Sequence, residues 1–185
     1  KWGLDVGRVA VSTVVLCTPD AAAAFRERGP CDALLLVTTD LGAETGRVML
    51  GSLDEGRLAL QEVHRFLNEP VKLHNTLCWD LPRLFKEIVC GIARGAAKAA
   101  GKIDGIGCDS WGVDFGLLDR SGGLLALPVH YRDARTEGMM AEVFRAIPRE
   151  RIFAETGTQF LALNTLYQVA ALGRETPEIF SAAGK

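Results

Sequence analysis

Apolar and polar positions alternate along the chain in a way that predicts most of its secondary structure. Residues 33–39 form an apolar, β-prone run, 48–50 resume that character, and 58–66 alternate in part. The segments between them, 40–46 and 54–56, contain the glycine and aspartate residues typical of tight turns. The pattern therefore predicts three short strands joined by tight turns.

A helical pattern follows these strands. Apolar residues recur at three- and four-residue spacing from Leu81 to Ala96, with Asp80 at the cap position and Gly101 at the expected end. A buried-type strand is expected at 103–108, a hairpin over 115–127, and helices at 136–146, 148–155 and 164–173. This order predicts an α/β fold with a mixed sheet and flanking helices. It resembles the ribonuclease-H-like fold of the actin and sugar-kinase ATPase superfamily.

The first 32 residues differ in pattern from the rest of the chain. An apolar stretch, 9–16, is followed by alanines at 21–24 and a charged, turn-rich run at 26–30. Asp5 and Arg8 interrupt what would otherwise imitate a signal peptide. We expect residues 1–32 to be an N-terminal extension, disordered or spuriously translated, ahead of a domain over 33–185.

Composition excludes several classes of protein. The 185 residues suffice for one domain, and 48% hydrophobic and 24% charged residues with a net charge of −2 give no basic excess for nucleic acid. No apolar run approaches the roughly 18 residues of a membrane span. The five cysteines are odd in number and form no Cys-x-x-Cys pair, which favours a reduced, cytoplasmic protein. No nucleic-acid or membrane partner is expected, and no oligomeric state is predicted.

The turn at 40–47, Asp-Leu-Gly-Ala-Glu-Thr-Gly-Arg, has the design of a phosphate cradle. Gly42 and Gly46 leave backbone N–H groups accessible, Thr45 offers a hydroxyl and Arg47 a positive charge. Asp40, at the strand end, could hold Mg²⁺ through its waters. A turn of this kind can equally be purely structural. It is neither a G-x-x-x-x-G-K-[ST] loop nor a G-x-G-x-x-G fingerprint.

A second candidate cluster follows the strand at 103–108. Asp109 and Asp114 flank Trp111 and Gly112, an arrangement that suits a polyol. Carboxylates accept from hydroxyls, an aromatic face packs on C–H groups, and glycine admits close approach. The structural alternative is a polar corner with a core tryptophan.

Several motifs, taken in order, resemble the rhamnulokinase pattern of the FGGY carbohydrate kinases. They are Asp40–Leu50, His64–Phe66, Trp79–Asp80, Asp109–Phe115, Pro128–Thr136, Thr156–Phe160 and Asn164–Gln168. The Trp-Gly-Val-Asp-Phe stretch at 111–115 and Tyr-Arg-Asp-Ala-Arg-Thr at 131–136 point to rhamnulokinases within the FGGY group. The resemblance runs from about residue 35 to about residue 175.

The resemblance implies a truncated FGGY kinase amino-terminal domain over 33–185, without the carboxy-terminal domain. It implies that ATP and Mg²⁺ are used to phosphorylate the 1-hydroxyl of a small sugar, L-rhamnulose, in L-rhamnose degradation. Ala43, Glu44, Thr45, Gly46 and Arg47 would form the first phosphate-binding loop, and Gly112 would contact the sugar. Glu44 departs from the serine expected at its position.

The resemblance also places the catalytic base, an aspartate, beyond Lys185. No catalytic residue is therefore expected in this chain, and the isolated chain is expected to be inactive. The alternatives are an inactive, truncated sugar-binding lobe, or a kinase for a related ketose or deoxyketose. Asp133 and Arg135 could line the sugar cleft, or form a buried ion pair with Thr136 capping the next helix.

Overall fold

The computed structural model describes residues 13–16, 33–54, 57–100 and 103–184, and these divide into two compact units. Unit 1 comprises the described parts of Lys1–Asn68 and Pro82–Gly112. Unit 2 comprises those of Glu69–Leu81 and Val113–Lys185. Each unit has a hydrophobic core of its own.

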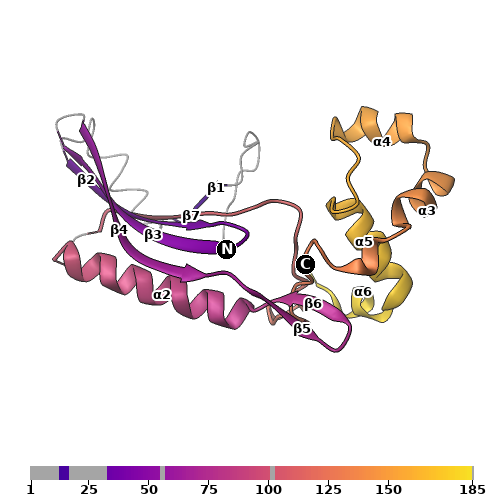
Figure 1. Ribbon diagram of the computed structural model, residues 1–185, viewed down its shortest axis with the longest axis horizontal. Coiled ribbons are helices and arrows are strands. Elements are labelled where there is room, and N and C mark those ends of the chain that lie inside the picture. Colours follow the sequence, from indigo (N-terminus) through magenta and orange to yellow (C-terminus); the bar gives the residue numbers. More distant parts are fainter. Residues whose placement is uncertain (1–12, 17–32, 55–56, 101–102, 185) are drawn as a thin grey trace. The chain divides into compact units, whose positions relative to one another are not determined.

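Unit 1 is built on a five-stranded mixed sheet with the order β1-β7-β2-β3-β4 (Figure 1). The strands are β1 (Thr13–Leu16), β2 (Ala33–Leu41), β3 (Thr45–Asp54), β4 (Arg57–Leu67) and β7 (Gly105–Asp109). β2, β3 and β4 pair antiparallel in succession, whereas β7 pairs parallel with β2. The three predicted strands are confirmed and are longer than expected, at 9, 10 and 11 residues.

Helix α2 (Leu81–Lys98) packs against one face of this sheet, as Figure 1 shows. A Cβ at Gly91 would lie only 2.3 Å from Cγ2 of Val48, which is fully buried. Glycine at this position therefore allows the helix to approach β3 closely. Because side chains alternate across a strand, the neighbouring Arg47 and its partner Asp40 lie on the face opposite α2.

Strand β1 is a difference from the sequence-based expectation. Thr13–Leu16 pairs antiparallel with β7, although residues 1–32 are predicted to form an extension separate from the domain. The other residues of that segment, 1–12 and 17–32, lie outside the described part of the chain, as does the predicted helix end at Gly101.

Unit 2 contains a hairpin and a set of short helices. These are β5 (Pro70–Leu73), β6 (Thr76–Trp79), η1 (Ala134–Thr136), α3 (Met139–Ala146), α4 (Arg149–Thr156), α5 (Thr165–Glu175) and α6 (Glu178–Ala182). Its core is formed by Met139, Val143, Ile152, Tyr167 and Ala171. The predicted hairpin over 115–127 is reduced to a single bridge between Leu118 and Leu124.

The start of α3 differs from the prediction of a helix over 136–146. Gly138, with a φ of 76°, precedes the helix, so the chain turns sharply there and α3 begins at Met139. Thr136 is buried and belongs to η1, so it does not cap the helix. Among the helices that the structure describes, none is long and apolar enough to cross a membrane.

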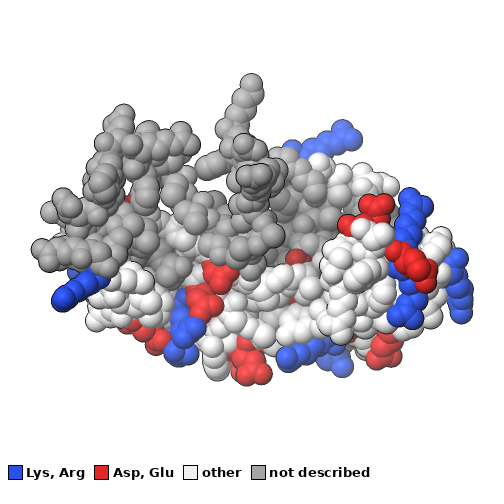
Figure 2. All heavy atoms as spheres, turned by 90° about the horizontal axis from the view of Figure 1, so that it is seen from above, with Lys and Arg blue, Asp and Glu red and all other residues white. Residues whose placement is uncertain are grey.

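Charges of both signs are interspersed over the described surface that Figure 2 displays. Basic and acidic side chains lie next to one another there rather than in separate patches. This distribution agrees with the net charge of −2.

Candidate functional site

The turn between β2 and β3 is held by Asn68, which follows the end of β4. Gly42 N–H donates to the Thr45 carbonyl at 2.9 Å, closing the turn. Asn68 donates from Nδ2 to the Gly42 carbonyl at 2.7 Å and from its backbone N–H to the Glu44 carbonyl at 2.8 Å. Asn68 is only 2% exposed, so its side chain is fixed. The carbonyls of Gly42, Glu44 and Thr45 are thus bonded to the protein.

The N–H groups at the tip of the turn, unlike its carbonyls, are not bonded to the described part of the protein. Within the described part of the chain, no acceptor is bonded to the N–H of Ala43 or of Glu44. The side chain of Glu44 is exposed, so the tip faces solvent. Successive free N–H groups in a turn form a concavity of positive partial charge that suits a phosphate oxygen. This geometry suits a phosphate, and the phosphate-binding role of residues 43–47 stays a prediction.

Gly46 is required by packing rather than by its backbone conformation. A Cβ at this position would lie 2.2 Å from Cζ of Phe66, an aromatic ring of the core. Phe66 faces Gly46 directly across the β3–β4 pair. A larger residue would displace the ring or the strand that carries the turn.

The sequence-predicted metal and phosphate residues, Asp40 and Arg47, bind each other. Arg47 donates from Nε to Oδ2 of Asp40 at 3.1 Å, and its Nη2 contacts the same oxygen. Both side chains are more than a third exposed, so solvent screens the pair. The Arg47 charge is therefore held beside the strand end, where it also orients the Asp40 carboxylate.

The parallel pairing of β2 with β7 brings the two candidate clusters together. Asp40, in the phosphate turn, and Asp109, in the sugar-type stretch, are partners in register. Partners in register point to the same face of a sheet. Asp109 is exposed. Two carboxylates thus lie side by side at the ends of their strands, on the face opposite α2.

A row of charges continues across the sheet from these carboxylates. Arg47 is paired in register with Asp40, and Arg65 with Arg47. Arg65 bonds Glu62 at 3.1 Å and lowers the pKa of that carboxyl group. Carboxylates and guanidinium groups are therefore collected at the end of the sheet that carries the turn.

Trp111 and Gly112 complete unit 1. Trp111 packs against the core cluster of Val48, Phe66 and Leu84 and is partly buried. Gly112 is exposed, and a Cβ there would meet no described atom within 4 Å. Packing therefore does not explain the glycine, whereas close approach of a ligand would.

Asp114, the fourth predicted sugar residue, holds unit 2 together. Its Oδ2 accepts from Trp79 Nε1 at 2.6 Å, and its Oδ1 accepts from Gln168 Nε2 at 3.0 Å. Trp79 and Gln168 are 2% and 1% exposed. Both carboxylate oxygens are thus bonded to buried donors, a role that the sequence alone does not indicate.

The hydrogen bonds of Asp133 and Arg135 bear on whether these two residues form a buried ion pair. Asp133 accepts from Leu77 N–H at 2.7 Å and from Arg135 N–H at 2.9 Å, which caps η1. The Arg135 guanidinium donates to Gln168 Oε1 at 2.8 Å instead of pairing with Asp133, and burial lowers the pKa of Arg135. Of the two alternatives, the ion pair is therefore replaced by two separate sets of hydrogen bonds.

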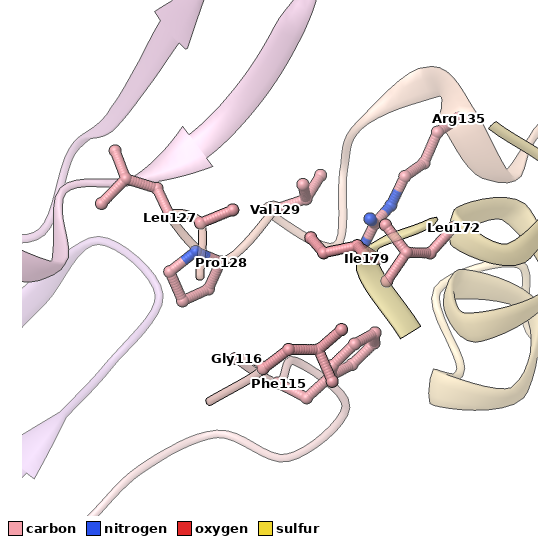
Figure 3. Close-up of a pocket in the computed structure, with 10 residues that line it drawn as sticks. Phe115, Gly116, Leu127, Pro128, Val129, Arg135, Leu172 and Ile179 are labelled. Atoms are coloured by element: carbon pink, nitrogen blue, oxygen red, sulfur yellow. The ribbon is translucent and has the colours of Figure 1, made fainter. Parts of the chain in front are cut away.

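Arg135 also lines a small apolar pocket in unit 2. Figure 3 shows its guanidinium extending toward Leu172 and Ile179, with Pro128 and Phe115 nearby. The pocket has a volume of about 50 Å³, which is room for a few waters and too little for a sugar.

No group of three or more His, Cys, Asp or Glu side chains in the described ranges forms a ready metal site.

Asn68 is a candidate functional residue that sequence reasoning missed. Its position becomes meaningful only through the β3–β4 register, which pairs Thr45 with Leu67 and so brings the next residue to the turn.

Comparison with known proteins finds kinases of sugars and related small molecules, both among sequence relatives and among structural neighbours. No protein-family model matches the chain. A rhamnulokinase from Oceanobacillus iheyensis is 45% identical over 147 residues, which are 80% of this chain and 31% of that relative. One from Klebsiella pneumoniae is 44% identical over 149 residues, 80% of this chain and 30% of the relative. The chain thus spans about 30% of the length of these curated relatives.

The structural neighbours are more distant in sequence. A gluconate kinase from Lactobacillus acidophilus superposes with a TM-score of 0.71 at 18% identity, covering 83% of this chain and 31% of that one. A xylulose kinase from the same organism gives 0.69 at 19%, covering 82% and 30%. A Plasmodium falciparum glycerol kinase with ADP gives 0.65 at 20%, covering 80% and 30%.

The fold is therefore that of sugar kinases with the actin- and hexokinase-like ATPase architecture, which confirms the predicted fold class. The sequence relatives narrow this class further. In sequence the chain is similar to rhamnulokinases, at 44–45% identity over about 30% of their length.

Replacing Asn68 tests whether its side chain fixes the turn. We expect Asn68→Ala to lower the free energy of unfolding by about 1–2 kcal/mol, because one buried hydrogen bond is lost. Hydrogen exchange at the amides of residues 42–46 should become faster. Both are measured on the purified chain by urea titration and by exchange mass spectrometry.

Asn75→Ala is the matched control, because Asn75 is exposed in the β5–β6 turn. It should leave both measurements nearly unchanged. Equal effects of the two substitutions would show that Asn68 has no special role.

Proposed function

We propose that this chain supplies the phosphate turn and part of the sugar side of an ATP-dependent kinase that converts L-rhamnulose to L-rhamnulose 1-phosphate. The proposal covers the whole protein that contains the chain, because the chain spans about 30% of its curated relatives. The observation that carries it is the register of Asp40 with Asp109. That register places the turn beside the stretch that leads to Gly112, and within the described ranges no acceptor bonds the N–H groups of Ala43 and Glu44 in that turn.

Phosphoryl transfer depends chiefly on positioning and on charge stabilisation. Under this proposal the N–H groups of Ala43 and Glu44, with the Thr45 hydroxyl, bind phosphate oxygens of ATP. Gly42 lets the turn close on the Thr45 carbonyl, and Gly46 leaves room for the ring of Phe66. Arg47 adds positive charge next to the turn while it orients Asp40. Gly112 and Trp111 lie along the sugar, and Asp114 keeps the following segment in place.

The donor set at the strand ends fits Mg²⁺. This ion prefers oxygen ligands, keeps several waters, and is usually held by one or two carboxylates together with substrate phosphates. Asp40 and Asp109 offer two neighbouring carboxylates on one face of the sheet. Mg²⁺ would screen the charge of the phosphates there, and Arg47 would hold Asp40 in orientation.

The proton of the sugar hydroxyl requires a base. The rhamnulokinase resemblance places that base, an aspartate, beyond Lys185, so we assign this role to none of the residues described. The turn and the sugar stretch then act as a binding and orienting half-site. The isolated chain would bind ligands without turning them over.

The assay of this proposal measures ADP release by the protein that contains this chain, with L-rhamnulose and MgATP. We expect turnover that depends on the sugar. We expect Asp40→Asn to lower kcat by about 10²–10³, as loss of one charged group that orients or stabilises the transferred phosphoryl does. Its effect on the KM for sugar should be small, because Asp40 belongs to the phosphate side.

Asp119→Asn is the control, because Asp119 lies in an exposed turn of unit 2 and its Oδ1, which an asparagine retains, accepts the bonds there. Its kcat should equal that of the unsubstituted protein. Sugar binding without ADP release would favour an inactive sugar-binding lobe, and full activity of Asp40→Asn would contradict the assigned site.

The exposed carboxylate of Glu44 gives a second, independent prediction. In water, a negative charge near the site weakens the binding of the ATP phosphates by a fraction of a kcal/mol to about 1 kcal/mol, because like charges repel. Glu44→Ser should therefore lower the KM for ATP about two- to fivefold and leave the KM for sugar unchanged. The difference should shrink at high salt, because exposed charges are screened.

Glu178→Ser serves as the comparison for Glu44→Ser, since Glu178 is an exposed carboxylate on α6 in unit 2. An increase in the KM for ATP on replacing Glu44 would mean that its side chain aids nucleotide binding.

A further inference from the structure

The residue after Gly112 has an unusual backbone conformation. Val113 has a φ of 78°, which lies in the left-handed region. Glycine adopts this region freely, whereas a β-branched residue adopts it only at a cost in free energy. Such strain persists where surrounding contacts impose it, and it collects at functional sites. The contacts of Val113 therefore show what imposes its conformation.

Two side chains of α5 bond the carbonyl oxygen of Val113. Thr165 donates to it from Oγ1 at 2.7 Å, and Gln168 donates from Nε2 at 3.2 Å. Residues three positions apart on a helix lie on the same face, so both side chains approach the oxygen from one direction. A carbonyl oxygen has two lone pairs and can accept both bonds. We call this pair of donors, Thr165 and Gln168, the α5 clamp.

The amide of Gln168 is fixed in orientation by its other partners. Its Oε1 accepts at 2.8 Å from the guanidinium of Arg135, a group that can only donate. Its Nε2 faces three acceptors, the Val113 carbonyl, Asp114 Oδ1 at 3.0 Å and the Leu163 carbonyl at 2.9 Å. Gln168 is 1% exposed. The amide cannot turn over without placing donor against donor, so the α5 clamp is rigid.

The φ of Val113 sets the direction of the peptide group that joins it to Gly112. Rotation about the N–Cα bond of Val113 from the left-handed to the extended region would turn this peptide plane over relative to α5. Gly112 is exposed, and no described atom lies within 4 Å of a Cβ placed there, so its backbone is open to a ligand. The α5 clamp thus decides which backbone groups such a ligand meets.

We propose that Thr165 and Gln168 are positioning residues for the sugar, which act by holding Val113 in the left-handed conformation and so fixing the Gly112–Val113 peptide. Neither residue needs to touch the sugar itself. The inference rests on the proposed function for the identity of the ligand. The hold of α5 on Val113 follows from the hydrogen bonds and is independent of that function.

The first arm of the test measures the conformation of Val113 in this chain by NMR. A positive φ brings the Hα of a residue close to its own amide proton, so the nuclear Overhauser effect between them is strong. We expect a strong effect at Val113, a weaker one in Thr165→Val, and no change in Thr165→Ser, which keeps the hydroxyl. Thr165 is exposed, so both variants should fold as the unsubstituted chain does.

The second arm measures the kinetics of the protein that contains this chain, with L-rhamnulose and MgATP. We expect Thr165→Val to raise the KM for sugar about three- to tenfold, as the loss of one hydrogen bond does. Gln168→Ala should raise it by at least as much, and Thr165→Ser should leave it unchanged. The KM for ATP should not change in any of these variants. A merely structural role would lower stability without separating the two KM values.

Gln61→Ala is the matched control for Gln168→Ala, because Gln61 is exposed on β4 in unit 1. It should leave both KM values and the Overhauser effect at Val113 unchanged. Gln168→Ala should melt at a lower temperature than the unsubstituted chain, because it removes buried hydrogen bonds. If it does not fold, the two Thr165 variants decide the proposal.

Two results overturn the proposal. An unchanged Overhauser effect in every folded variant would show that α5 does not hold Val113. A weakened effect with an unchanged KM for sugar would show that the α5 clamp is structural only, and the proposed function would then stand without it. If the unsubstituted protein turns over no L-rhamnulose, the proposed function fails, and the NMR arm still decides whether α5 holds Val113.

Discussion

The parallel pairing of β2 with β7 is the constraint on which the candidate site depends. The two strands are far apart in sequence, and their register decides which of their ends meet. With Asp40 beside Asp109, the turn that follows β2 and the stretch that follows β7 leave the sheet at the same edge. A shift of one residue would turn one of these carboxylates toward α2.

Other contacts fix the details around that pairing. Gly91 lets α2 approach Val48, which stabilises the sheet from one side and leaves the face with Asp40 and Arg47 free of that helix. Asn68 bonds the carbonyls of Gly42 and Glu44, and the N–H groups of Ala43 and Glu44 bond no acceptor among the described residues. A carboxylate pair that suits a cation and a turn that suits an anion thus lie next to each other at this edge of the sheet.

The elements with strong periodicity could be predicted from the sequence, and the long-range contacts could not. The strand at 33–39, the helix starting at Leu81 and the helix at 164–173 are all found close to their expected bounds. The β5–β6 hairpin was not predicted from the sequence, because its strands have four residues each, too few to show alternation.

The same holds for the candidate site: its local motifs could be predicted from the sequence, and its long-range contacts could not. The turn and the Trp-Gly stretch carry local signatures, so they stand out in the sequence. Asn68 acts on residues 26 positions away, and Asp114 binds Trp79 35 positions away, so no local pattern reveals either role.

The most direct measurement of the account is an amide NMR titration of this chain with MgADP. If the phosphate turn and the sugar stretch share one sheet edge, shifts should appear at residues 42–46 and, through the neighbouring strand end, at 109–112, and Asp40→Asn should remove both. Shifts confined to unit 2, or none at either stretch at saturating nucleotide, would contradict the claim that the β2–β7 edge is a nucleotide site.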